Sequence, residues 1–367
     1  MGFKCGIVGL PNVGKSTLFN ALTRTAAAQA ANYPFCTIEP NTGEVAVPDP
    51  RMQKLASVAG SKEIIPTRIS FVDIAGLVRG ASKGEGLGNK FLANIREVDA
   101  IVHVLRCFED DDITHVEGRI NPVGDAETIE TELMIADLES LERRTDQTRK
   151  RAAAKDKESM TVLPMMEAAL KLLQDGKPVR TMLKSLSAED LAILKGLNLL
   201  TSHPVLYVCN VSEEDAATGN AHTEAVARMA AEQGAESIVV SAAIESEVAQ
   251  LPDDEAKEFL SALGLDEAGL DQLIRAGYQL LDLITYFTVG PKETRAWTIE
   301  RGTKAPAAAG VIHTDFERGF IRAFTIAYDD YVTLGGEVPA KEAGKARDEG
   351  KEYVVQDGDV IHFRFNT

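Results

Sequence analysis

The sequence has few cysteines and comparatively little positive charge. Its 367 residues include four cysteines, which are widely spaced and form no C-x-x-C pair. This spacing argues against a disulfide framework or a zinc site, and it favours free thiols in a reducing compartment. Asp and Glu outnumber Lys and Arg by 56 to 39, which gives a net charge of −17. A uniformly basic surface is thereby excluded, so DNA is not an expected partner and any RNA contact requires a local basic patch.

Long hydrophobic runs are also missing. No apolar stretch of the sequence approaches the ~18 residues that a membrane-spanning helix needs. The short apolar run near the N-terminus leads directly into a glycine-rich motif, so we expect no signal peptide. With 44% hydrophobic and 26% charged residues, the composition is that of a globular protein with room for two or three domains. We therefore expect a cytoplasmic protein that does not bind a membrane.

The most informative motif lies close to the N-terminus. A strand-like run, Phe3 to Val8, leads into GLPNVGKST at residues 9–17, which has the G-x-x-x-x-G-K-[ST] spacing of a phosphate-binding loop. The glycines allow backbone N–H groups to turn toward a phosphate, and Lys15 supplies a positive charge for the β- and γ-phosphates. The Ser16 hydroxyl is a suitable ligand for Mg²⁺. The loop predicts nucleoside triphosphate binding through Asn12, Val13, Gly14, Lys15, Ser16 and Thr17.

Short β-branched runs alternate with helical patterns along most of the chain, which predicts a doubly wound α/β sheet. The expected strands are Cys5–Val8, Val45–Pro48, Ile69–Asp73, Ala100–Cys107, Val205–Asn210 and Ser237–Ser241. Ligands of such sheets bind beyond the carboxyl ends of the strands, and the polar motifs of this sequence occur there.

The segment between the fourth and fifth predicted strands is far longer than a crossover needs, and its surplus has a helical pattern. Further helices are expected near 253–263 and 269–284, followed by short alternating runs. We predict a nucleotide-binding domain at 1–129 and 202–280, a coiled-coil-like helical insert at 130–201 and a small mixed domain at 281–367.

A second motif, D-x-x-G from Asp73 to Gly76, follows the third predicted strand. Asp73 is suited to hold Mg²⁺ through water, while the Gly76 N–H is suited to reach a γ-phosphate. Thr37 is the candidate second Mg²⁺ ligand, from a loop that orders around triphosphate. We expect Lys15, Asp73 and Gly76 to act in catalysis. His115 is a further catalytic candidate at the ligand edge of the sheet, with an ordinary solvated loop histidine as the alternative.

These motifs resemble those of the Obg group of translation-factor-type GTPases, whose P-loop domain is a three-layer α/β/α structure. Residues 9–17, 33–40 and 73–88 look like the phosphate loop and two switches of that group. The helical insert and the C-terminal segment narrow the resemblance to the YchF, or Obg-like ATPase, subfamily, over essentially the whole chain. The resemblance implies that residues 281–367 form a TGS domain of the β-grasp type. It also implies that Asn12 ligates K⁺ and that the partner is the ribosome, either its large subunit or the whole particle.

The base-reading motif departs from that of GTPases. Those proteins use N-K-x-D, in which Asp pairs with guanine, whereas residues 210–213 read Asn-Val-Ser-Glu. The side chain of Glu213 is one methylene longer than that of Asp, so its carboxylate lies away from the position that pairs with guanine. Val211 lacks the aliphatic stem with which the Lys of the GTPase motif covers the base. A guanine donor left unpaired costs about 1–3 kcal/mol. The resemblance likewise implies ATP, with GTP as the rival, and we expect Asn210, Val211, Glu213, Ser241 and Ala242 to form the base pocket.

Several alternatives stay open at this point. Basic residues gathered between Arg143 and Lys157 predict either a solvated helix tip or a cationic finger for RNA. Leu77 stands where related GTPases carry a water-orienting Gln, which predicts slow hydrolysis to ADP and phosphate. The leading hypothesis is a regulatory ATPase linked to translation or stress. A GTPase of the same architecture and a nucleotide-stabilised binding module that needs no hydrolysis are the alternatives. The loop position of Cys36 raises the question of oxidant sensing.

Overall fold

The computed structural model describes residues 3–31, 41–74, 87–110 and 119–366, and the chain divides into two compact units. The first unit is Met1–Val45 with Ser70–Leu273, and the second is Ala46–Ile69 with Ile274–Thr367. The helical insert groups with the first unit. We predicted that residues 46–69 belong to the nucleotide-binding domain, but they group with the second unit. They contribute an edge strand to the sheet of that unit and a helix that packs against it.

The first sheet has the strand order β2-β4-β1-β5-β6-β7. Its strands are β1 (Lys4–Val8), β2 (Thr42–Ala46), β4 (Arg68–Asp73), β5 (Ala100–Arg106), β6 (Val205–Asn210) and β7 (Glu236–Val240). The strand β1 pairs in parallel with both β4 and β5, and β6 pairs in parallel with β5 and β7. The central strands β5 and β6 are buried at every position, which matches their nearly continuous apolar sequence. Five of the six predicted strands are confirmed to within one residue at their ends, whereas β2 begins at Thr42 and shares only Val45 and Ala46 with its predicted range 45–48.

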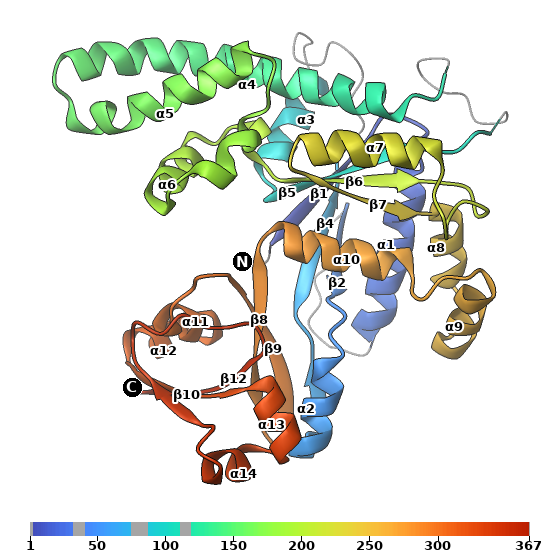
Figure 1. Cartoon of the computed structure of the whole chain (residues 1–367), viewed down its shortest axis with the longest axis vertical. Helices are drawn as coiled ribbons and strands as arrows, with labels where there is room; N and C mark the ends of the chain where they lie inside the picture. Colours follow the sequence, from blue (N-terminus) through green and yellow to red (C-terminus); the bar gives the residue numbers. More distant parts are fainter. Residues whose placement is uncertain (1–2, 32–40, 75–86, 111–118, 367) are drawn as a thin grey trace. The chain divides into compact units, whose positions relative to one another are not determined.

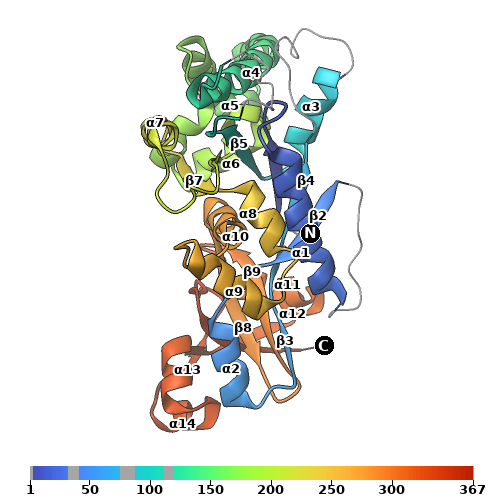
Figure 2. The ribbon, with the colours of Figure 1, turned by 90° about the vertical axis from the view of Figure 1, so that its right-hand side faces the viewer.

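Helices cover both faces of this sheet, so the unit has three layers (Figure 1). The helices around it are α1 (Lys15–Ala31), α3 (Leu87–Arg96), α4 (Pro122–Ala153), α7 (Ala221–Glu232), α8 (Ala242–Val248) and α9 (Asp253–Ala262). The helix α10 (Gly269–Leu280) begins in the first unit and ends in the second. On one side, α1 and α8 pack against each other, as both views show (Figure 1, Figure 2). On the opposite side, α4 contacts both α7 and β5. The predicted three-layer α/β/α fold is confirmed.

The helical insert is built on an antiparallel pair, the long helix α4 and α5 (Lys157–Gln174), which extends away from the sheet (Figure 1). It continues through η1 (Val179–Ser185), α6 (Ala188–Leu197) and η2 (Leu200–Ser202). The pair buries a shared apolar cluster that includes Leu141, Met166 and Ala169. The N-terminus of α6 is capped, because the Ser187 hydroxyl accepts a hydrogen bond from the Asp190 N–H at 3.1 Å.

Buried polar contacts hold the insert together, because they join its later segments to the long helix α4. The Arg180 guanidinium donates two hydrogen bonds to the Glu130 carboxylate, at 3.0 and 2.6 Å, and both side chains are almost fully buried. The Asp137 carboxylate accepts hydrogen bonds from the N–H groups of Leu200 and Thr201 at 2.9 and 2.8 Å. These contacts satisfy the buried charges and the first donors of a short helix, and they set where the insert ends.

The second unit contains a mixed sheet with the order β11-β10-β12-β8-β9-β3. Its strands are β3 (Glu63–Ile65), β8 (Leu283–Val289), β9 (Glu293–Glu300), β10 (Phe320–Ala327), β11 (Arg347–Glu349) and β12 (Asp359–Phe365). Its helices are α2 (Arg51–Ala59), α11 (Ala305–Ile312), α12 (Thr314–Arg318), α13 (Tyr328–Leu334) and α14 (Glu337–Glu342). The strands alternate between two cores: Tyr286 packs in the core that contains α11, while Phe287 packs in the core that contains α2.

One predicted element is wrong. The sequence pattern predicted a helix to about residue 284, but α10 ends at Leu280 and β8 begins at Leu283. Asp282 has a φ of 50°, a left-handed conformation that a helix cannot continue through. The run LITYFTV that follows is β-branched and aromatic, so it joins the sheet.

Within the described residues, no helix combines the length and the apolar character that a membrane crossing requires. The cysteines Cys5, Cys107 and Cys209 are free and buried, as their strand positions predicted. Burial raises the pKa of the Cys5 thiol to about 12, which keeps it protonated and unreactive. Cys36 lies outside the described residues, so its redox sensitivity stays an open question.

Candidate functional site

The phosphate loop connects β1 to α1 and has the tight backbone that its sequence predicts. Gly14 has a φ of 90°, and a Cβ at this position would collide with the side-chain amide of Asn210. A Cβ on Gly9 would lie 2.8 Å from the main-chain oxygen of Val104. Both positions therefore require glycine. The loop ends where the 17-residue helix α1 begins at Lys15, so its free N–H groups and the helix dipole favour an anion.

Asn210 links this loop to the other side of the site. Its Nδ2 donates to the main-chain oxygen of Val13 at 2.9 Å, and its Oδ1 accepts from the Ala242 N–H at 2.9 Å. The side chain is buried, and both ends of its amide are satisfied. Asn210 therefore holds the phosphate loop against the start of α8, across 197 residues of sequence to Val13.

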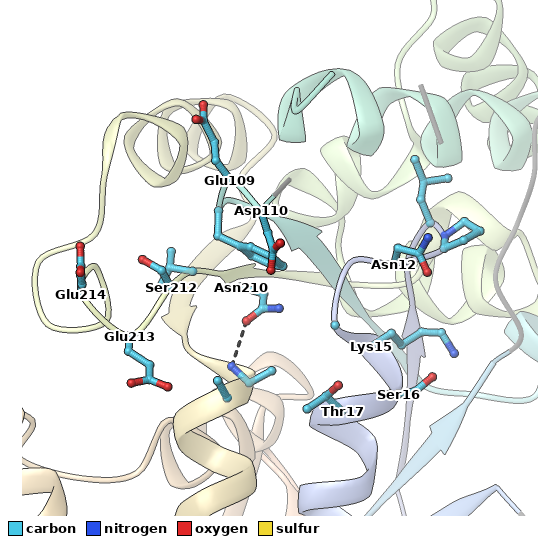
Figure 3. Close-up of a pocket in the computed structure, with 17 residues that line it drawn as sticks. Asn12, Lys15, Ser16, Thr17, Glu109, Asp110, Asn210, Ser212, Glu213 and Glu214 are labelled. Atoms are coloured by element: carbon cyan, nitrogen blue, oxygen red, sulfur yellow. Dashed lines mark hydrogen bonds between the residues drawn. The ribbon is translucent and has the colours of Figure 1, made fainter. Parts of the chain in front are cut away.

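These elements surround a cavity of about 1010 Å³. In Figure 3, Lys15 and Ser16 lie at one end, Glu213 and Glu214 at the other, and Asn210 between them. Its lining comprises Leu10, Pro11, Asn12, Gly14, Lys15, Ser16, Thr17, Phe108, Glu109, Asp110, Asn210, Val211, Ser212, Glu213, Glu214, Ala242 and Ala243. One end thus carries positive charge and hydroxyl groups, and the other combines apolar side chains with carboxylates. This distribution of side chains suits a ligand that has phosphate groups at one end and a flat, partly apolar ring at the other.

Lys15 and Asp73 meet beside the phosphate loop, where their side chains form an ion pair. Both side chains are mostly shielded from solvent. Asp73 ends β4, and β4 pairs with β1, so the sheet register brings this carboxylate next to the loop. The carboxylate of Asp73 and the hydroxyl of Ser16 are the hard oxygen ligands that Mg²⁺ prefers. The residues present are thus of the chemical type that a magnesium–nucleotide complex needs.

Helix α8 supplies the wall opposite the loop, and a buried carboxylate anchors it. Glu245 accepts hydrogen bonds from the N–H groups of Gly269 and Leu270 at 2.7 and 3.0 Å, and so caps the start of α10. Burial raises the pKa of Glu245. The anchor fixes the position from which Ala242 and Ala243 face the cavity.

Several predicted site residues are not in the cavity lining. Val13 and Ser241 are buried; Val13 contributes its main-chain oxygen to Asn210, and Ser241 precedes α8 as its N-cap residue. Thr37, Gly76 and His115 lie outside the described residues, so their assigned roles stay predictions. The remaining predicted residues of the phosphate loop and the base pocket lie together.

The sequence interpretation missed one wall of the cavity, formed by Phe108, Glu109 and Asp110 directly after β5. A signal was available, since the carboxyl ends of β1, β5 and β6 share one edge of a parallel sheet. From the sequence we applied this argument only to His115 of the same loop, and it applies equally to the three residues directly after β5.

A sheet with helices on both faces, a phosphate loop at its carboxyl edge and an adjoining cavity define the class of this protein. It is a P-loop protein with a nucleotide-binding domain of the GTPase type. The family model described as "50S ribosome-binding GTPase" matches residues 4–137. The model for the C-terminal domain of YchF GTPases, described as a protein of unknown function, matches residues 283–366.

Full-length relatives identify the family. The chain is 59% identical to "Ribosome-binding ATPase YchF" of Pasteurella multocida over 367 residues, which covers all of both chains. It is 56% identical to the protein of the same name from Bacillus subtilis, again over the full length of both. The solved "Structure of the Schizosaccharomyces pombe YchF GTPase" matches with a TM-score of 0.88 and 39% identity, over 99% of this chain and 98% of that one. The chain belongs to the YchF family.

Proposed function

We propose that this protein is a Mg²⁺-dependent ATPase that binds the ribosome and hydrolyses ATP to ADP and phosphate. One observation carries the proposal: a single cavity has the phosphate loop at one end and the non-guanine motif of residues 210–213 at the other. The curated relatives at 55–59% identity, which share the full length, are named ribosome-binding ATPases. Lys15 and the α1 N-terminus would hold the phosphates, while Ser16 and Asp73 would hold Mg²⁺. The proposed partner implies a cytoplasmic protein.

A GTPase is the second candidate, because the solved yeast relative and one family model are both named as GTPases. Calorimetric titration with Mg-ATP and Mg-GTP tests the choice, and we expect ATP to bind at least about tenfold more tightly. Glu213→Asp restores the carboxylate length of the guanine-reading motif. This change should shift the affinity ratio toward GTP by roughly threefold to tenfold, while Glu214→Asp, on the same wall, should leave it unchanged. Preferential binding of GTP by the unaltered protein would contradict the proposal.

The basic end of the α4–α5 pair is the proposed ribosome contact. Of its cationic residues, Arg144 donates to the main-chain oxygen of Leu197 at 2.8 Å and Arg149 pairs with Glu167 at 2.8 Å. Lys150, Arg151, Lys155 and Lys157 are exposed. In a chain with net charge −17, such a local cluster is suited to an RNA backbone.

Co-sedimentation with ribosomes tests this contact. The double variant Lys150→Glu, Lys157→Glu should lose binding, and the wild-type interaction should weaken steeply with salt. The control Lys177→Glu, Lys184→Glu makes the same charge change at exposed positions of the same unit, and it should bind normally. Equal loss in both variants would indicate a general charge effect and would contradict the assignment.

The proposal extends to regulation. The triphosphate and diphosphate forms would present different surfaces to the ribosome and so link nucleotide state to translation or stress. A variant that binds ATP without hydrolysing it should lose regulated release from ribosomes.

We also propose that Asn12 ligates K⁺, so that replacement of K⁺ by Na⁺ should slow the turnover of ATP. The C-terminal unit is proposed to act as a TGS domain that assists ribosome binding.

A further inference from the structure

Arg106, the last residue of β5, has a fully buried guanidinium beside the cavity. Only 2% of its surface is exposed. Its Nε donates to the main-chain oxygen of Phe108 at 3.1 Å, and a terminal nitrogen donates to the main-chain oxygen of Asp110 at 3.0 Å. A buried cation is costly unless its donors are used, and here they grip the backbone of the wall that follows β5. The shape of this wall therefore depends on Arg106.

The same guanidinium also packs on the ring of Phe108, with its central carbon 4.7 Å from the ring centroid. This distance is within the range of a cation–π contact. Phe108 is half-buried and lines the cavity, so the part of the ring that Arg106 does not cover is available to a ligand. An aromatic ring held in this way is a suitable stacking surface for a flat heterocycle.

The wall lies at the level of the base motif. Arg106 is the register partner of Asn210 on the neighbouring strand, and the Cys107 N–H donates to the Asn210 main-chain oxygen at 2.8 Å. Phe108 and Val211 therefore leave adjacent strands at the same height, and both line the cavity. Together they add two apolar surfaces to the cavity lining, next to the predicted base motif.

We propose that Arg106 is the positioning residue of the base pocket: it fixes Phe108 as the surface on which the purine of the nucleotide stacks. Arg106 acts through Phe108 and does not touch the ligand. The inference rests on the proposed function, since it needs a nucleotide in this cavity. Stacking on Phe108 would increase the affinity for the nucleotide through its base, independently of the contacts that the phosphate loop makes.

Two probe ligands distinguish binding of the base from binding of the phosphates: Mg-ATP, which has both, and inorganic tripolyphosphate with Mg²⁺, which has only phosphates. Arg106→Lys keeps the charge but loses the planar guanidinium that grips two carbonyls at once. We expect this variant to bind ATP roughly tenfold more weakly, on the scale of one aromatic contact, while tripolyphosphate affinity changes less than about twofold. The control Arg228→Lys, at an exposed position of α7, should bind both probes as wild type does.

A double-mutant cycle tests whether Arg106 acts through the ring. Phe108→Leu should weaken ATP binding but not tripolyphosphate binding, and adding Arg106→Lys should cause little further loss. Phe108→Tyr, which keeps the ring, should restore ATP binding. If Arg106→Lys does not fold, the Phe108 variants still test whether the purine stacks on the ring, without which Arg106 could not act through it. Unchanged ATP affinity in Phe108→Leu would overturn the inference, as would equal loss of both probes in Arg106→Lys.

These outcomes differ from a failure of the proposed function. If the unaltered protein bound tripolyphosphate as tightly as any nucleotide, the proposed ATPase would fail before any variant was measured. If it bound ATP well and the Phe108 variants did the same, only the inference about Arg106 would fail.

Discussion

The side chain of Asn210 donates a hydrogen bond to the main-chain oxygen of Val13, 2.9 Å away, and so joins the end of β6 to the phosphate loop. The other end of the same amide accepts from the Ala242 N–H. One buried side chain therefore sets the spacing between the surface for the phosphates and the surface for the base. The contribution of Asn210 to nucleotide binding therefore comes from this spacing, and it does not depend on which base the protein recognises.

Removal of this bridge should loosen the site. Asn210→Ala leaves the Val13 oxygen and the Ala242 N–H buried without their partner, at about 1–3 kcal/mol for each. We expect nucleotide affinity to fall at least about tenfold, measured by calorimetric titration with Mg-ATP. Asn94→Ala, at an exposed position of α3, is the matched control and should bind normally. Wild-type affinity in Asn210→Ala would show that the loop holds its shape without the bridge.

A methyl group at Gly14 should abolish nucleotide binding. The residue has a φ of 90°, and the added Cβ would collide with the Asn210 amide. The backbone strain alone is roughly 1–2 kcal/mol. Gly196→Ala provides the comparison, because a Cβ there meets nothing within 4 Å and the residue lies inside α6. That change should stabilise the protein by about 0.5–1 kcal/mol, as measured by urea unfolding, without altering binding.

The insert should depend on the buried pair of Glu130 and Arg180. Glu130→Leu leaves the Arg180 guanidinium buried without its carboxylate, which should lower the free energy of unfolding by about 3–5 kcal/mol. Glu167→Leu removes an exposed partner of Arg149, where both side chains are about half exposed, and should lower the free energy of unfolding far less, because solvent screens this pair. Urea denaturation of the two variants compares these losses. Similar small losses in both would mean that apolar packing alone holds the insert in place.

Stability should fall in mild acid because of His103. Burial, with the nearby charge of Arg180 as the smaller cause, lowers the pKa of His103 to about 3 from its ordinary 6.5. Between these values the unfolded chain binds a proton that the folded chain excludes. The stability is therefore complete above pH 6.5 and decreases toward pH 3, by up to about 1.4 kcal/mol per pH unit.

Urea unfolding at about pH 7 and about pH 5 measures this slope. His103→Gln should reduce the difference between the two conditions, whereas His362→Gln, at an exposed position, should not. An unchanged slope in His103→Gln would assign the acid sensitivity to other groups. His203 is the nearest candidate, since burial lowers its pKa as well.

Local patterns predicted the local features well. The phosphate loop and five of the six strands of the first sheet each depend on a few neighbouring residues, and the structure has them where they were predicted, to within one residue. The end of α10 was mispredicted because an apolar run fits a helix or a buried strand equally well until Asp282 breaks the helix. The grouping of residues 46–69 with the second unit could not be foreseen for a different reason, since it depends on pairing with a distant strand: β3 pairs with β9, more than 200 residues away.

The sequence by itself determined that this protein grips a phosphate chain, because the loop carries its glycines, its lysine and its hydroxyl within nine consecutive residues. It also determined the family, through motifs that are contiguous. Only the tertiary structure decided what surrounds the rest of the ligand. The pair Arg106 and Phe108, the side chain of Asn210 and the start of α8 at Ala242 come from three distant parts of the chain, and they meet because parallel strands end at one edge of the sheet. A contact made by strand register and buried hydrogen bonds leaves no local pattern in the sequence, so the wall formed by Phe108 and the Asn210 bridge to Val13 became visible only in the folded protein.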